Sequence, residues 1–424
     1  MATLSTGRKC PYCASSIELG DCPIVATSYK GGEFRGAEEL ELDEVELFSG
    51  ARPTRLLRKT GWPVLSEAPR EVQAEALVGQ QGRSRFEQAF AGFSDSGADR
   101  AELPPLLGNG ISREDVPARA CWECEFPLPQ SIDHRPAIVV AVVGVNRVGK
   151  THFLATSLTA AYRHQGLGPI GCTEFVPDDS TGKRFMEDYY YPLFRRGTIL
   201  EPTQAENEEV RFQPLVFNVT LRDGNPFSLV MHDVAGEVLG ERDLRARNAT
   251  FLHGAQGIIF VVDPRDIDDL RDSLPASMWD EEDLGWDQGS LLSTCLSPDG
   301  LPARPDPIPI AIAIAKADQL PHATGEPLSF LTPAPDGEAE DEFYQRLRST
   351  SRAVQDFLEA QRAHNILGPA RGYERQLEEV GAHPTVTYHA FSALGGSRQD
   401  IEQAGAKVRP INALDPLAAI LSQL

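Results

Sequence analysis

The segment 138–151, IVVAVVGVNRVGKT, constrains the fold more than any other part of the chain. It begins with a run of β-branched and apolar residues, which is typical of a buried strand. It ends in GVNRVGKT, 144–151, which matches the pattern G-x-x-x-x-G-K-[ST]. The segment 152–165, HFLATSLTAAYRHQ, then has the composition of a helix. A strand, a glycine-bounded turn and a helix in this order predict a phosphate-binding loop.

Each position of this pattern has a physical role toward a phosphate. Gly144 and Gly149 allow the backbone to curl so that its N–H groups point inward at an anion. Lys150 would place a positive charge between the β- and γ-phosphates, and the Thr151 hydroxyl can ligate Mg²⁺. A chance match in a glycine-rich turn is the alternative, which the flanking strand and helix disfavour. The loop residues that we assign to nucleotide binding are Gly144, Asn146, Arg147, Val148, Gly149, Lys150, Thr151 and His152.

Charge and hydropathy exclude several classes of partner. The 424 residues carry 40 Lys and Arg against 62 Asp and Glu, a net charge of −22. This balance argues against a nucleic-acid backbone or an anionic membrane as the main partner. There is no apolar N-terminal segment of the secretory type and no run of eighteen apolar residues, so we expect a cytoplasmic protein without a membrane span.

Four of the seven cysteines form two C-x-x-C pairs, Cys10 with Cys13 and Cys121 with Cys124. In a reducing compartment such pairs indicate a metal rather than disulfides. Two knuckles that aim their thiolates at one point would complete a tetrahedral, structural Zn²⁺ site, because four thiolates leave no open position for catalysis. Cys22 competes for one ligand position. A redox pair and purely structural turns are the alternatives.

The order of these features suggests a division of the chain. We expect a first zinc knuckle at 1–22, an insertion at 23–118, a second knuckle at 119–130 and a P-loop domain at 131–424. The P-loop domain carries an acidic insertion at about 264–306. No catalytic constellation lies in 23–118, so an interaction surface is the default expectation for that segment.

The pattern downstream of the P-loop predicts an α/β fold. Apolar strands alternate with helices such as 343–363, which implies a mostly parallel sheet covered by helices on both faces. The segment 182–197 contains an aromatic cluster that we expect to pack as a helix. The further predicted strands are 211–221, 226–236, 257–263, 307–318 and 385–393.

Short polar motifs lie at the carboxyl ends of three of these strands. Asp233 and Gly236, in DVAG, come where a P-loop enzyme needs a carboxylate near Mg²⁺ and an N–H toward the γ-phosphate. Asp318, in Lys316-Ala317-Asp318, can accept N1–H and the exocyclic amine of guanine, while the Lys316 stem lies over the base. The motif Ser392-Ala393-Leu394 can present a backbone N–H to guanine O6. Ligands of such sheets bind at the carboxyl ends of the strands.

With GVNRVGKT, DVAG, AKAD and SAL in this order, the segment 136–424 resembles the translation-factor-like (TRAFAC) class of P-loop GTPases. Within that class it is most similar to the bacterial double-GTPase family, in which cysteine knuckles often precede the GTPase domain. The segment 409–421, RPINALDPLAAIL, is similar to the end of that family's domain. The resemblance implies GTP and GDP as ligands, Mg²⁺, a paralogous GTPase as protein partner, and work in a bacterial conflict or defence system.

The sequence departs from this resemblance at three places. Ala315 stands where the base motif usually begins with Asn or Thr, so one supporting hydrogen bond is missing. Glu237 stands where small GTPases often carry the Gln that orients the attacking water. The switch I threonine, a Mg²⁺ ligand, is assigned to Thr203, with Thr198 as the alternative.

Four other side chains have two readings each. Arg195 and Arg196 are candidates for an arginine finger, and a solvent-facing pair is the favoured reading. Arg147 either reaches the nucleotide of a neighbouring copy or faces solvent. His232 is read as a core residue rather than a base, because it alternates to the face opposite Asp233.

The leading hypothesis is therefore a Mg²⁺-dependent GTPase that acts as a switch for a protein partner. Lys150, Thr203 and Glu237 are its candidate catalytic residues, and Thr151, Thr203 and Asp233 its candidate Mg²⁺ ligands. The alternatives are a zinc-stapled interaction module that binds nucleotide and hydrolyses it poorly, and an ATPase.

Overall fold

The structure is a computed structural model of the whole chain. The residues it describes are 9–13, 15–18, 22–26, 29–30, 33–34, 55–56, 63–66, 117–126, 128–133, 135–164, 166–200, 214–222, 226–233, 250–274, 287–296, 307–335, 337–379, 381–382, 386–396, 401 and 407–424.

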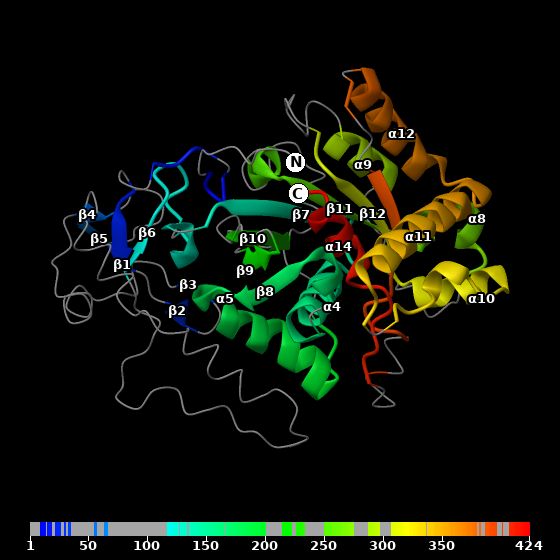
Figure 1. The fold of residues 1–424 in the computed structure, drawn as a ribbon, viewed down its shortest axis with the longest axis horizontal. Helices are drawn as coiled ribbons and strands as arrows, with labels where there is room; N and C mark the ends of the chain where they lie inside the picture. The colour runs from blue at the N-terminus through cyan, green and yellow to red at the C-terminus, as the bar shows by residue number, and fades with distance from the viewer. Residues whose placement is uncertain are drawn as a thin grey trace.

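A seven-stranded sheet forms the centre of the molecule, in the order β13-β12-β11-β7-β10-β9-β8 (Figure 1). Five neighbouring strands, from β13 to β10, run parallel. Every residue of β7, β11 and β12 is buried, because these are runs of Val, Ile, Ala and Phe covered on both faces. The parallel strands are β7 (Ala137–Val143), β10 (Pro226–Asp233), β11 (Gly257–Val262), β12 (Ile310–Ile314) and β13 (Val386–Ala390).

Two antiparallel strands extend the sheet beyond β10. The strand β9 (Leu215–Leu221) pairs with β10, as the sequence predicts for a hairpin. The strand β8 (Cys172–Pro177) pairs with β9 at the edge of the sheet, with an irregular register between Cys172 and Glu174. The strand β8 is not among the strands that the sequence predicts.

Helices cover both faces of the sheet. In Figure 1, α4 (Lys150–His164) and α5 (Asp179–Arg184) lie on the lower side, and α9 (Gln288–Leu296) and α12 (His364–Glu379) on the upper side. The aromatic segment continues α5 as a π-helix, η4 (Phe185–Arg196), as expected for a packed helix. The remaining helices are α8 (Asp268–Arg271), α10 (Leu320–Thr324), α11 (Glu340–Ala360) and α14 (Asp415–Leu421).

Short 3₁₀ turns connect these elements. Their bounds are η2 (Gln130–Asp133), η3 (Gly168–Ile170), η5 (Thr250–Gly254), η6 (Pro264–Asp266), η8 (Ala317–Gln319) and η9 (Ser329–Leu331).

A small sheet lies at the amino end of β7, at the left of Figure 1. Its order is β4-β5-β1-β6, and its pairs are antiparallel. These strands are β1 (Ile24–Ala26), β4 (Arg55–Leu56), β5 (Pro63–Ser66) and β6 (Pro117–Arg119), and a separate pair consists of β2 (Tyr29–Lys30) and β3 (Glu33–Phe34). The first cysteine knuckle precedes β1 and the second follows β6. The pairing of β1 with β6 therefore brings the two knuckles together.

The predicted fold class is confirmed: a mostly parallel sheet with a P-loop after β7, helices on both faces, and a four-cysteine element beside it. The segments 69–77 and 83–93, whose sequences are typical of short helices, lie outside the described residues. Within the part of the chain that the structure describes, no helix is both long enough and apolar enough to cross a bilayer.

Candidate functional site

The P-loop has the backbone that its glycines require. A Cβ atom on Gly144 would lie 2.6 Å from the Val261 carbonyl oxygen, so only glycine fits between β7 and β11. Gly149 has a φ of 103°, which an L side chain rarely adopts, and Arg147 has a φ of 55°. Val148 is buried and Arg147 points to the surface. The turn between β7 and α4 is thus fixed by packing and by two residues whose φ angle is positive.

Lys150 lies inside this loop. Its Nζ donates to the carbonyl oxygens of Gly144 at 2.9 Å and Val145 at 2.7 Å, and the side chain is 6% exposed. These bonds hold the positive charge at the mouth of the turn, beside the N-terminus of α4. Thr151, in the first turn of α4, is half-buried. The loop therefore offers a cation, backbone N–H groups and a hydroxyl at one point, which is the chemistry that binds a phosphate.

Asp233 is the last residue of β10 and lies beside the P-loop. It pairs in register with Val142 on β7, two residues before Gly144, and is 7% exposed. The parallel pairing of β7 and β10 thus brings the carboxylate next to the turn that holds Lys150. A carboxylate there can support a Mg²⁺ ion bound to a phosphate.

The predicted base-reading segment follows β12 and is tied to β13. The Ala317 N–H donates to the Phe391 carbonyl oxygen at 3.0 Å. Asp318 is half-buried and accepts a short hydrogen bond from the Gln319 side-chain amide. Its carboxylate therefore stands at the carboxyl edge of the sheet, on the side of the P-loop where β12 and β13 lie.

The Ser392-Ala393-Leu394 turn is closed by the C-terminal segment. Ser392 Oγ accepts from the Gly395 N–H at 2.9 Å, and the backbones of Ser392 and Ile411 form a β-bridge. The Arg409 N–H donates to the Leu394 carbonyl oxygen at 3.0 Å. The segment 407–411 therefore holds this turn against the end of β13.

One edge of the sheet thus carries all of these groups. Neighbouring strands lie ~4.8 Å apart, so the end of β12, two strands from β7, is roughly 10 Å from the P-loop. This interval is short enough for a nucleoside triphosphate to span from Lys150 to Asp318. The strand order therefore brings the predicted phosphate-binding and base-reading segments to the same edge of the sheet.

Sequence reasoning missed a buried ionic cluster at the same edge. Asp263 follows β11 directly and is 0% exposed, with Arg265 Nη2 at 2.7 Å and Lys316 Nζ at 2.9 Å from its Oδ2. Lys316, predicted to lie over the base, therefore points its ammonium group at Asp263. The position of Asp263 at a strand's carboxyl end was the signal that could have found it.

A second missed contact involves His152, in the first turn of α4. Its Nε2 accepts from the Leu200 N–H at 3.2 Å. Leu200 is buried with Ala155 and Leu193, and Leu394 packs against this small cluster. The chain that leads to the predicted switch I is therefore attached to the helix that begins at the P-loop.

Part of the predicted switch machinery lies outside the described residues, namely Thr203, Gly236 and Glu237. Thr198, the alternative to Thr203, is exposed, and its N–H donates to the Pro192 carbonyl oxygen at 2.9 Å. Arg195 and Arg196, at the end of η4, are exposed, as the solvent-facing reading predicts.

The four predicted zinc ligands come together. The Sγ atoms of Cys10, Cys13, Cys121 and Cys124 all lie within 4.8 Å of one another. The Cys10–Cys124 and Cys13–Cys121 Sγ pairs are each 3.7 Å apart, and all four are free cysteines. A tetrahedral ion with Zn–S bonds of ~2.3 Å requires sulfurs ~3.8 Å apart, so this donor set fits Zn²⁺ and is too wide for disulfides. Cys22 is buried and is not a member of the group.

The pKa is lowered for two of the four cysteines, Cys13 and Cys121, and raised for the other two, Cys10 and Cys124. The hydrogen bond with Cys10 lowers the pKa of Cys13 to about 7, and the same neighbour holds the pKa of Cys121 below its usual range. Burial raises the pKa of Cys10. The four thiols therefore differ in how readily they lose a proton, and a bound metal would displace the protons that remain.

The first knuckle contacts the central sheet directly. His232, the residue before Asp233, donates from Nε2 to the Pro11 carbonyl oxygen at 2.8 Å, and its ring stacks on Phe251 with centroids 3.9 Å apart. Burial lowers the pKa of His232 to about 4, so the ring is neutral near pH 7. The core reading of His232 is correct, and the structure adds its contact with the knuckle.

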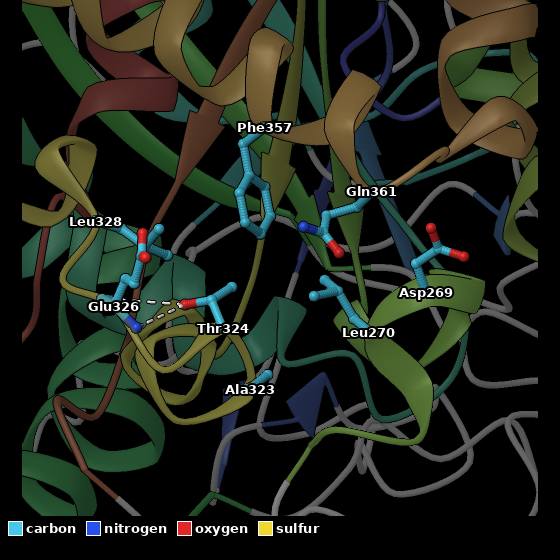
Figure 2. Close-up of a pocket in the computed structure, with 8 residues that line it drawn as sticks. All are labelled: Asp269, Leu270, Ala323, Thr324, Glu326, Leu328, Phe357 and Gln361. Atoms are coloured by element: carbon cyan, nitrogen blue, oxygen red, sulfur yellow. Dashed lines mark hydrogen bonds between the residues drawn. The ribbon is translucent and has the colours of Figure 1, made fainter.

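An open pocket lies between α8, α10 and α11. Figure 2 shows Phe357 of α11 and Gln361, the residue after α11, facing Leu270 of α8 and Thr324 of α10 across it. Asp269, at its rim, forms an ion pair with Arg362 at 2.6 Å. None of the residues predicted to bind nucleotide lines this pocket.

Comparison with known proteins gives one related sequence and several structures with a distant likeness. No protein-family model matches the chain. A Mycolicibacterium smegmatis protein named as a candidate ESX-1 scaffolding and assembly protein, SaeC, is 26% identical over 263 residues, which are 58% of this chain and 66% of that protein. The chain therefore spans just under two thirds of the length of this relative.

Among solved structures, the chain is similar to the Arl6 BBS3 small GTPase of Trypanosoma brucei with bound GppNp, at 12% identity and a TM-score of 0.26, over 62% of this chain and 92% of that one. The SRb-GTP/SRX complex of Chaetomium thermophilum has 14% identity and a TM-score of 0.26, over 64% and 98%. Bacterial elongation factor EF-Sec has 15% identity and a TM-score of 0.24, over 68% and 29%. With TM-scores this low, the fold assignment rests on the strand order and the P-loop themselves.

Proposed function

We propose that the chain is a Mg²⁺-dependent guanine-nucleotide-binding protein that hydrolyses GTP to GDP and phosphate and acts as a switch for a protein partner. One observation carries the proposal. Lys150 follows β7, Asp233 ends β10 and Asp318 follows β12, and the carboxyl ends of these strands form one edge of one sheet. A cation for the phosphates, a carboxylate for Mg²⁺ and a carboxylate for the base would thus lie along the length of a single nucleotide.

The base end supports guanine over adenine. A carboxylate accepts two hydrogen bonds from the N1–H and exocyclic amine of guanine, and adenine has no matching pair of donors. The half-buried Asp318 is the group that would accept them, and the Ser392-Ala393-Leu394 turn beside it would present a backbone N–H to O6.

The phosphate end supports hydrolysis. Lys150 would lie against the β- and γ-phosphates, and Thr151, Thr203 and Asp233 would hold the Mg²⁺, which neutralises charge on the phosphate oxygens. A water would attack the γ-phosphorus while the bond to the β-phosphate oxygen breaks and GDP leaves. Glu237 follows Gly236 at the place of the water-orienting residue.

The switch role rests on how the nucleotide site connects to the rest of the molecule. Segments near 195–205 and 234–248 would be ordered by the γ-phosphate and released after hydrolysis. Leu200, bonded to His152 of α4, lies at the start of the first of these segments. The similarity to a candidate scaffolding and assembly protein is consistent with a protein partner, and a paralogous GTPase in a conflict or defence system comes from the family resemblance alone.

Single-turnover hydrolysis tests the proposal. Excess chain is mixed with GTP and Mg²⁺, and released phosphate is followed against buffer and against Asp233→Asn. We expect phosphate release by the wild-type chain and a large loss in the variant. Tight GTP binding with phosphate release no faster than in buffer would instead favour the interaction module, and preferential turnover of ATP would favour an ATPase.

A further inference from the structure

The first residue of the predicted base-reading loop, Ala315, has no side-chain group that can form a hydrogen bond. Ala315 is 1% exposed, and its N–H donates to the Val262 carbonyl oxygen at 2.9 Å as part of the β11–β12 pairing. A methyl group forms no hydrogen bond, so the side chain of Ala315 cannot fix the loop that follows. Another group must hold Lys316 and Asp318 in place.

The loop also contains an unfavourable backbone conformation. Lys316 has a φ of 52°, in the left-handed region that a non-glycine residue adopts only where its surroundings impose it. This conformation turns the chain from β12 into η8, the turn that contains Asp318. The interactions that stabilise Lys316 therefore also set the direction of Asp318.

Asp263 supplies those interactions from the neighbouring strand. Its Oδ2 accepts from Lys316 Nζ at 2.9 Å and from Arg265 Nη2 at 2.7 Å, and its Oδ1 accepts from Arg265 Nε at 2.9 Å. Lys316 is 32% exposed, whereas the carboxylate of Asp263 is 0% exposed. The ammonium group thus sits between the buried carboxylate and the edge of the sheet.

The backbone of Asp263 is fixed as firmly as its side chain. Gln288 of α9 is 0% exposed; its Oε1 accepts from the Asp263 N–H at 2.5 Å, and its Nε2 donates to the Asp263 carbonyl oxygen at 2.9 Å. Burial alone would raise the pKa of Asp263, but Lys316 and Arg265 together hold it below its usual range. Asp263 is therefore a rigid, ionised group at the carboxyl end of β11.

We infer that Asp263 is a positioning residue for guanine selectivity: its carboxylate holds Lys316, and through Lys316 it sets the carboxylate of Asp318 against the base. The inference rests on the proposed function. From the end of β11, Asp263 thus supplies the side-chain hydrogen bond that Ala315 cannot supply from within the loop. The bond from Ala317 to Phe391 holds the other side of the same loop.

Selectivity between GTP and inosine triphosphate tests this role. Inosine keeps N1–H and lacks the exocyclic amine, so the ratio of the two dissociation constants reports whether Asp318 is aligned to accept both donors. The full chain with Mg²⁺ is titrated with each nucleotide. A charge-assisted hydrogen bond is worth roughly tenfold or more in affinity, so we expect the wild-type ratio to favour GTP by at least about tenfold.

Asp263→Asn removes the charge and keeps the shape, and we expect it to reduce the ratio at least about fivefold. Asp263→Glu keeps the charge and displaces the carboxylate, and should give an intermediate ratio; it decides the question if Asp263→Asn does not fold. The matched control is Asp415→Asn, because Asp415 is also buried, at 4% exposure, and is paired with Arg346 at 2.6 Å. We expect Asp415→Asn to be less stable than the wild-type chain and to keep the wild-type ratio of the dissociation constants for GTP and inosine triphosphate.

A wild-type ratio in Asp263→Asn, together with a loss of stability like that of the control, would show that the cluster is only structural and would overturn the inference. In that case GTP binding by the wild-type chain would leave the proposed function intact. A wild-type chain that binds no GTP would overturn both.

Discussion

At the scale of single residues, Asp318 is the side chain that we propose distinguishes a guanine site from a general purine site. In Asp318→Asn the side chain offers an N–H where the carboxylate offered a second acceptor. Xanthine carries a carbonyl oxygen in place of the exocyclic amine of guanine, so it matches the new donor. We expect roughly 100-fold weaker GTP binding and improved binding of xanthosine triphosphate, measured by competition titration.

The control for this change is Asp269→Asn, since Asp269 is an aspartate of α8 paired with Arg362 at the surface. It should leave both affinities as they are in the wild-type chain. If Asp318→Asn retained full guanine selectivity, the role given to Asp318 would be wrong.

The residues that the sequence predicted are those whose chemistry follows from a local motif. Lys150 and Asp318 are defined by their position after an apolar strand, and the structure places both at the expected edge. The ion pair between Asp263 and Lys316 and the contact between His152 and Leu200 could not be predicted in this way, because each joins residues that are far apart in the sequence. A buried ion pair becomes visible only once the neighbouring strands are in register.

At the scale of elements, the two knuckles should act as one zinc centre. Cys121→Ser removes one of four thiolates, and three remaining sulfurs hold the ion much less tightly. We expect metal analysis of the purified chain to fall from about one zinc ion per chain to nearly none, with a lower melting temperature.

The matched control is Cys172→Ser, because Cys172 lies on β8 outside the cluster. Its zinc content should equal that of the wild-type chain. Full retention of zinc in Cys121→Ser would contradict the four-cysteine centre.

The contact between the Ser392-Ala393-Leu394 turn and the C-terminal segment depends on one glycine. Gly395 has a φ of 73°, and a Cβ atom there would lie 2.0 Å from the Arg409 carbonyl oxygen. Gly395→Ala should therefore separate segment 407–411 from the turn, with about 2 kcal/mol or more of lost stability and weaker GTP binding. Chemical denaturation and GTP titration measure the two effects.

Gly325 provides a control with the same backbone strain. Its φ is also 73°, but nothing lies within 4 Å of the added Cβ. Gly325→Ala should lose only about 1 kcal/mol and keep its GTP affinity. Equal effects of the two substitutions would mean that strain alone acts at Gly395.

Elements with a strong pattern were predictable and elements with mixed patterns were not. The strands β7, β11 and β12 are continuous apolar runs, since both of their faces are covered. The edge strand β8, CTEFVP, is only partly buried, so its sequence lacks that signal. The helix α12 was missed because Gly368 and Pro369 lie inside it, and these residues usually indicate a break.

At the scale of the whole molecule, the four-cysteine element and the central sheet that carries the P-loop belong to one packed body. Cys10 and Cys121 are part of the same buried cluster as the strands of the central sheet. The hydrogen bond from His232 to Pro11 joins the first knuckle to β10, one residue before Asp233. The first cysteine knuckle therefore contacts the strand that ends at the predicted Mg²⁺ ligand, and this contact does not follow from the sequence motifs taken one by one.

Equilibrium titration of GTP and ATP into the full-length chain, with Mg²⁺ present, tests the central claim most directly. Lys150→Ala is the matched variant, because it removes the ammonium group from the P-loop and keeps the backbone of α4. The account predicts GTP binding at least roughly 100-fold tighter than ATP binding, lost in the variant. Equal affinities for the two nucleotides, or GTP affinity that is unchanged in Lys150→Ala, would contradict it.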